Sequence, residues 1–137
     1  MVISGTGPLR RPRILVVDDD QALLRMLDKI MSKVGDVVCA KDGQEAFDRL
    51  LAGDIPDIII TDLMMPRMDG MQLCAQIQGH PKLKSIPVIM LTAKGTPKDV
   101  IAGINQGARH YVVKPFKTQD LIKKVATVLG RKDLMYE

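Results

Sequence analysis

Residues 56–70, PDIIITDLMMPRMDG, decide the fold of this chain. The isoleucine run 58–60 is too short for a helix and is typical of a strand buried on both faces in a parallel sheet. The strand is expected to end at Asp62, because Pro66 and the pair Asp69-Gly70 then indicate a turn. A carboxylate is thereby placed at the carboxyl end of a central strand. Open α/β sheets bind their ligands at this edge.

Apolar segments on either side of this strand alternate between two periods, one typical of strands and one of helices. Strict alternation predicts an α/β fold: a doubly wound, five-stranded parallel sheet with right-handed crossovers and helices on both faces. The other strands are expected at 13–17, 36–40, 86–92 and 110–113, and the helices at 21–34, 43–52, 71–78, from about 97, and at 118–129.

The length of 137 residues suits one domain with one core. Residues 1–12 contain two glycines and two prolines without periodicity, which predicts a flexible N-terminal arm. The domain is expected at 13–130 and a short C-terminal tail at 131–137. We therefore expect no separate output domain in this chain.

Composition excludes several classes of protein. No apolar run is long enough to cross a bilayer, residues 1–13 lack a secretory signal, and Cys39 and Cys74 have neither metal nor redox spacing. These features predict a cytoplasmic protein with reduced thiols and no membrane contact. The net charge of +4 permits nucleic-acid binding, but without interleaved aromatic residues the lysines and arginines are better interpreted as a solvated surface. No direct nucleic-acid partner is expected.

Polar side chains follow the predicted strands at their carboxyl ends: Asp18 and Asp19, then Asp62, Thr92 and Lys114. Parallel strands bring all five to one rim of the sheet. Clustered carboxylates repel one another, so the site should raise a pKa or hold a cation. Oxygen ligands without histidine or cysteine favour Mg²⁺.

A carboxylate, Mg²⁺, the Thr92 hydroxyl and the Lys114 ammonium together predict a phosphoryl site, where cation and donors neutralise charge on the transferring group. One carboxylate could be the nucleophile and form an acyl phosphate, and Asp62 is the first candidate. Each residue alone has an ordinary structural explanation as a helix cap, a solvated lysine or a loop hydroxyl. The combination of all five on successive strands is much more specific.

The chain resembles the receiver domain of two-component response regulators, and in plan the single-domain chemotaxis type, over about residues 13–129. The resemblance implies a flavodoxin-like fold with strand order 2-1-3-4-5. It rests on Val16-Val17-Asp18-Asp19, on residues 62–70, on Leu91-Thr92-Ala93 and on Tyr111-Val112-Val113-Lys114-Pro115-Phe116.

The resemblance also implies a metal site. Asp62 matches the phospho-accepting aspartate, which is also a metal ligand. Asp19 matches the direct Mg²⁺ ligand, and Asp18 matches the acidic partner that acts through water. The backbone carbonyl of Met64 matches the third protein ligand.

The remaining matches concern the switch. Thr92 resembles the hydroxyl that moves to the phosphoryl group, and Lys114 the lysine that pairs with phosphate, followed by a cis bond to Pro115. Tyr111 resembles the aromatic residue that turns inward on activation. Met64 and Lys94 occupy two positions that tune phosphoryl lifetime in the family. Since the Met64 side chain cannot align a water molecule, we expect slow self-dephosphorylation.

The leading hypothesis is a phosphorylation-activated switch. A sensor histidine kinase or phosphotransfer protein would phosphorylate Asp62 with Mg²⁺ bound, and a downstream effector protein would bind the altered surface. The chain would be a monomer or a weak phosphorylation-dependent dimer. It would not be an enzyme beyond its self-phosphorylation and slow self-dephosphorylation.

Three alternatives stay open. The first is an aspartate-nucleophile phosphatase or hydrolase, which would need a substrate-binding cap. The second is a phosphorylation-independent module that binds protein or nucleic acid. The third is a receiver fragment of a longer regulator.

Overall fold

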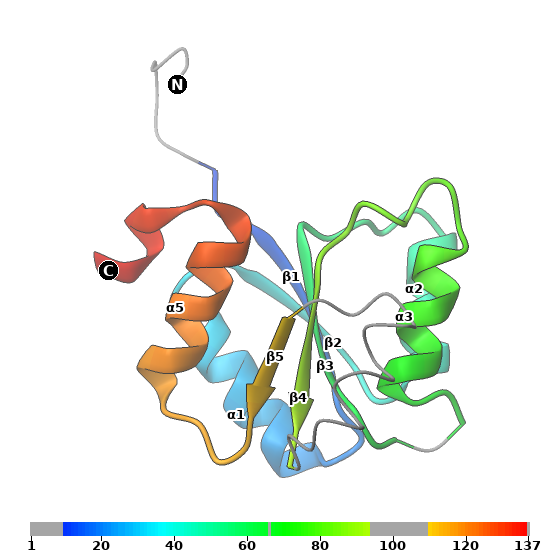
Figure 1. The fold of residues 1–137 in the computed structure, drawn as a ribbon, viewed down its shortest axis with the longest axis horizontal. Helices are drawn as coiled ribbons and strands as arrows, with labels where there is room; N and C mark the ends of the chain where they lie inside the picture. Colours follow the sequence, from blue (N-terminus) through cyan, green and yellow to red (C-terminus); the bar gives the residue numbers. More distant parts are fainter. Residues whose placement is uncertain (1–9, 66, 94–109, 137) are drawn as a thin grey trace.

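Five parallel strands form one sheet in the order β2-β1-β3-β4-β5, which confirms the predicted fold class and strand order (Figure 1). The structure is a computed structural model, and it describes residues 10–65, 67–93 and 110–136. The strands are β1 (Arg13–Val17), β2 (Asp36–Ala40), β3 (Ile58–Asp62), β4 (Val88–Thr92) and β5 (His110–Val113).

Helices cover both faces of the sheet, as the alternation predicted. In Figure 1, α1 (Gln21–Met31) and α5 (Thr118–Leu129) lie on one face, and α2 (Gly43–Leu51) and α3 (Gly70–Gln78) lie on the other. The helix expected from about residue 97 lies outside the described residues.

Two boundaries differ from prediction by more than one residue. Helix α1 ends at Met31 instead of Val34, because the amides of residues 33–35 turn back onto the carbonyls of Ile30 and Met31. Strand β4 begins at Val88 instead of Ile86, since Pro87 contributes a carbonyl but no N–H to the ladder.

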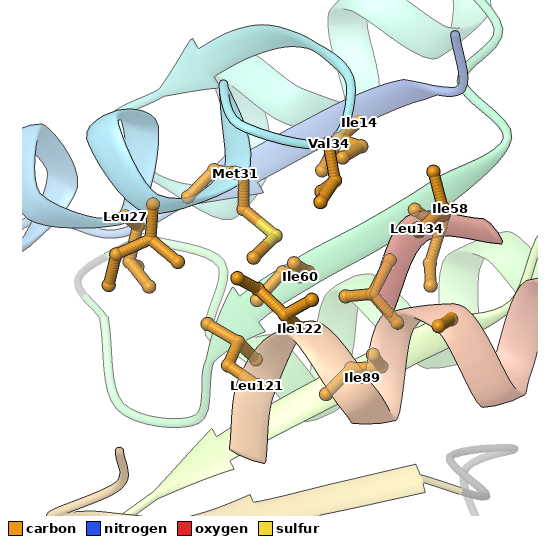
Figure 2. Packing of buried hydrophobic residues seen from close by; sticks show 14 of the residues in the cluster. Ile14, Leu27, Met31, Val34, Ile58, Ile60, Ile89, Leu121, Ile122 and Leu134 are labelled. Carbon is orange, nitrogen blue, oxygen red and sulfur yellow. The ribbon is translucent and has the colours of Figure 1, made fainter. Parts of the chain in front are cut away.

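The central strand β3 is buried on both faces. Ile58 and Ile60 belong to the core cluster under α1 and α5, which Figure 2 shows, whereas Ile59 belongs to the cluster under α2 and α3. All three isoleucines are fully inaccessible to solvent. The centre of the sheet is therefore buried between two apolar layers, and polar side chains gather where its strands end.

The chain segments on either side of the predicted domain also contact it. The Arg11 guanidinium donates to the carbonyls of Ser32 and Gly35 just after α1. At the other end, Lys132–Tyr136 forms a 3₁₀ helix, η1, whose Leu134 is only 5% exposed and belongs to the cluster of Figure 2. Periodicity could not predict η1, because η1 contributes a single buried leucine.

Replacing Leu134 by alanine is expected to lower the free energy of unfolding by about 2–4 kcal/mol, because it opens a cavity beside α5. Urea denaturation followed by circular dichroism measures the change. Lys132→Ala, on the exposed side of η1, is the control and should leave the midpoint nearly unchanged. Equal midpoints for Leu134→Ala and the parent protein would show that η1 adds nothing to the core.

Within the described part of the chain, no helix combines the length and the apolar character that crossing a bilayer requires.

Candidate functional site

The carboxyl ends of the strands bring the predicted site residues to one rim. Asp62 is the last residue of β3, where it pairs with Leu91, and Thr92 is the last residue of β4. The Lys114 amide donates to the Thr92 carbonyl at 2.7 Å, which places Lys114 directly beyond β5. Asp18 follows β1, and its amide donates to a carbonyl of β2.

Three carboxylates form an acidic cluster on this rim. Asp18, Asp19 and Asp62 each offer an oxygen, and these atoms lie within 4.8 Å of one another. Asp18 is fully buried, Asp62 is partly buried and Asp19 is exposed. The cluster is therefore open to solvent on the side of Asp19 and closed on the side of Asp18.

Asp18 is the member of the cluster whose carboxylate is least well satisfied. Its Oδ1 accepts a hydrogen bond from the Asp20 amide at 2.9 Å, but its Oδ2 is buried without a hydrogen-bond partner among the described residues. Burial above all, together with the charges of Asp62 and Asp19, raises the pKa of Asp18 to about 6, although the Asp20 amide and Lys114 act in the opposite direction. The unpartnered oxygen needs a cation or a proton.

These residues fit a hard divalent cation. All the side-chain donors are carboxylate oxygens, they converge within one ligand sphere, and the orphaned Asp18 oxygen is the kind of group that a bound ion or its water would satisfy. The fit agrees with Mg²⁺, which the sequence predicted on the same carboxylates.

The Asp62 carboxylate is also held by two donors. Its Oδ1 accepts from the Lys114 ammonium at 3.0 Å and from the Leu63 amide at 2.9 Å. The side chains of Asp62 and Lys114 are 15% and 23% exposed, so the pair is reachable from solvent and yet partly shielded from it. Shielding strengthens the charge pair.

The other predicted residues differ in position and burial. Thr92 is buried at the rim, and the Met64 side chain is 73% exposed, two residues beyond Asp62. Tyr111 is half-buried against the cluster under α2 and α3, and burial raises the pKa of its hydroxyl. The peptide bond between Lys114 and Pro115 is cis, as the resemblance implied. Lys94 lies outside the described residues.

Helix caps account for two further aspartates. Asp20 caps α1 by accepting from the amides of Ala22 and Leu23, and Asp69 caps α3 in a reciprocal pair with Gln72. Both caps begin helices that leave the rim, so they fix the direction of the chain next to the acidic cluster.

One ion pair on the same rim was not predicted from the sequence. Arg67, in the loop between β3 and α3, donates from Nε and Nη2 to Oδ2 of Asp42, which precedes α2. The two residues are 25 positions apart, and no local pattern connects them. The only signal was the cap-like position of Asp42 before Gly43, and it says nothing of Arg67.

A doubly wound sheet with an acidic cluster, a hydroxyl and a lysine at the carboxyl ends of its strands is the arrangement that the resemblance to receiver domains implied. The family model of the response regulator receiver domain matches residues 14–126, and the chain belongs to this family. Receiver domains of two-component systems bind Mg²⁺ in an acidic pocket, and Asp18, Asp19 and Asp62 form such a pocket here.

Individual relatives agree with this assignment. The response regulator MprA of Mycolicibacterium vanbaalenii is 40% identical over 120 residues, which are 87% of this chain and 51% of MprA. The solved structure of the chemotaxis protein CheY4 of Vibrio cholerae superimposes with a TM-score of 0.80 at 30% identity, covering 85% of this chain and 98% of CheY4. The receiver domain of the Francisella response regulator 1452 gives a TM-score of 0.77 at 32% identity, covering 88% and 98%. The chain spans about half the length of the curated relatives that it matches.

Proposed function

We propose that the chain is a phosphorylation-controlled switch whose acceptor is Asp62. One observation carries the proposal: the Asp62 carboxylate contacts the Lys114 ammonium at 3.0 Å and shares a ligand sphere of 4.8 Å with Asp18 and Asp19. A nucleophilic oxygen, a fixed cation and a site for a divalent ion thus meet at the end of one strand.

Phosphoryl transfer would proceed by attack of an Asp62 carboxylate oxygen on the phosphorus atom of a phosphohistidine in a sensor histidine kinase or phosphotransfer protein. An O–P bond forms, the P–N bond breaks, and the departing imidazole keeps the electron pair of that bond and takes up a proton. Asp18, Asp19 and Asp62, with the backbone carbonyl of Met64, would hold Mg²⁺. When bound, Mg²⁺ supplies positive charge against the oxygens of the phosphoryl group.

Lys114 and Thr92 would transmit the change. The ammonium that now pairs with Asp62 would pair with a phosphoryl oxygen, and the Thr92 hydroxyl would donate to another. Tyr111, on the strand next to Thr92, would follow the threonine, and an effector protein would bind the altered surface. The chain would turn over only its own acyl phosphate, as a monomer or a weak phosphorylation-dependent dimer.

Incubation with Mg²⁺ and a small acyl phosphate tests the proposal by intact mass. We expect a single phosphoryl adduct that disappears when a chelator is present. Absence of an adduct under these conditions, in protein that is folded and binds Mg²⁺, would reject the acceptor role and favour a phosphorylation-independent interaction module.

Replacing Lys114 by methionine is expected to slow phosphoryl uptake about tenfold or more, because the variant keeps the aliphatic stem and loses the charge next to Asp62. The rate is measured by intact mass at fixed times. Lys117→Met removes an exposed lysine three residues further on and should keep the parent rate. Equal rates in the parent and Lys114→Met would show that the ammonium does not assist transfer.

The acyl phosphate is expected to persist for minutes or longer, because the side chain two residues beyond the acceptor, Met64, is apolar and has no group that could align water. Removing donor and following the adduct by mass gives the half-life. Met64→Asn introduces such a group and should shorten it. A half-life of seconds in the purified parent protein would contradict slow self-dephosphorylation.

A further inference from the structure

An ion pair outside the acidic cluster joins two loops that lie on the same rim. Arg67 donates to Oδ2 of Asp42 from Nε at 2.9 Å and from Nη2 at 2.6 Å. The Asp42 side chain is almost completely buried, whereas that of Arg67 is exposed over its outer part. A buried carboxylate with two charge-assisted hydrogen bonds is a firm anchor for the loop that carries Arg67.

The anchor is itself rigid. Oδ1 of Asp42 accepts from the Glu45 amide at 2.8 Å and so caps α2, which leaves Oδ2 for Arg67. Burial alone would raise the pKa of Asp42, but the hydrogen bonds from Glu45 and Arg67 outweigh it and hold that pKa below its usual range. Asp42 is therefore ionised at neutral pH and fixed to the end of a helix.

The backbone around Arg67 would not keep its conformation unaided. Its φ of 63° lies in the left-handed region, which is unfavourable for a residue with a side chain and persists where the surroundings hold it. The next residue supplies a second tie, because the Met68 carbonyl accepts from the Gly43 amide at 3.0 Å. A Cβ atom at Gly43 would clash with that carbonyl oxygen, so the two loops are in backbone contact.

The start of the same loop is held next to Asp62, the proposed acceptor. The Leu63 amide donates to Asp62, and the Leu63 carbonyl accepts from the Gly70 amide at 3.0 Å. The loop is thus tied next to Asp62 and again at Arg67. Met64 lies between these ties in the sequence, two residues beyond Asp62.

We propose that the Asp42–Arg67 pair is a positioning device for the phosphoryl site: by holding the loop after β3, it would let the backbone carbonyl of Met64 serve the cation site. Neither residue belongs to the acidic cluster. The inference rests on the proposed function for its biological meaning, but its physical content is an effect on cation affinity.

Magnesium titration of the metal-free full chain by isothermal titration calorimetry tests this role. Arg67→Gln and Asp42→Asn, which keeps a good helix cap, are each expected to weaken Mg²⁺ binding about tenfold. The double variant should be no weaker than either single variant, because both substitutions remove one interaction. Arg49→Gln, which breaks the 3.5 Å pair with Asp54, is the control and should leave the affinity unchanged.

A further variant separates the ion pair from the backbone strain. Arg67→Gly removes the guanidinium but readily adopts a positive φ, and it should bind Mg²⁺ as weakly as Arg67→Gln. Parent-like affinity in Arg67→Gly would overturn the proposal, as would parent-like affinity in Arg67→Gln and Asp42→Asn accompanied only by a lower melting temperature.

The same experiment distinguishes this inference from the proposed function. The titrations use protein that has met no phosphodonor, so they do not depend on whether Asp62 accepts a phosphoryl group. Weak Mg²⁺ binding in the pair variants would support the positioning role even if the parent protein formed no adduct. In that event only the assignment of Asp62 as the phosphoryl acceptor would fail.

Discussion

Asp62→Asn is expected to reduce the phosphoryl adduct to background, in a protein that remains folded. The amide is not a nucleophile towards phosphorus, whereas its oxygen can still accept the hydrogen bond from the Leu63 amide. The substitution removes the partner of Lys114 but also removes one negative charge from the cluster with Asp18 and Asp19, so its effects on folding oppose each other. Intact mass after incubation with Mg²⁺ and an acyl phosphate measures the adduct.

Asp57→Asn is the matched control for this experiment. Asp57 immediately precedes β3, at the opposite end from Asp62, and its carboxylate accepts from the Arg13 amide at 2.7 Å, away from the acidic cluster. The control should acquire the adduct at the parent rate. An adduct of parental amount on Asp62→Asn would place the acceptor on another residue, and peptide mapping would then locate it.

Alternating periodicity was sufficient for the fold because the strands are short and apolar and the central ones, β1, β3 and β4, are largely buried. Ile58, Ile59 and Ile60 are typical of a strand in any context that buries both faces, and the alternation around them leaves few arrangements of the sheet. Features that depend on one long-range contact could not be predicted from periodicity. Leu134 in η1 and the Arg11 contacts after α1 are examples, because a single residue has no period.

Some features of the site could likewise be predicted from the sequence, and others could not. The rim residues could be predicted because parallel strands carry whatever follows them to one edge, and Asp18, Asp62 and Lys114 do meet there. The burial of Asp18 could not be predicted, since Asp18 and Asp19 are adjacent aspartates and the sequence does not say which one faces inward. The Asp42–Arg67 pair could not be predicted either, because it depends on how two loops meet after the sheet has formed.

The buried Asp18 carboxylate should make the metal-free protein less stable at neutral pH than it is in mild acid. Its pKa is about 6 in the folded chain, against a usual value of 3.8, so the fold favours the protonated form. The free energy of unfolding is therefore highest below pH 3.8 as far as this group is concerned, and it falls as the pH rises towards 6. A pKa difference of this size between the folded and unfolded chain corresponds to about 3 kcal/mol in the free energy of unfolding.

Asp18→Asn is accordingly expected to stabilise the metal-free protein at pH 7 by up to about 3 kcal/mol, because the amide keeps the bond from Asp20 and carries no charge. Urea denaturation at pH 7 and pH 5 measures this change in stability, and the gain should shrink at pH 5, where the parent carboxylate is mostly protonated.

With saturating Mg²⁺ the order of stability should reverse, since the parent gains more from the ion than a variant with one carboxylate fewer. Asp19→Asn, at the exposed end of the cluster, should gain much less without metal. A metal-free Asp18→Asn protein less stable than the parent at pH 7 would show that the carboxylate is satisfied without a cation, and the case for Asp18 as part of the metal site would fail with it.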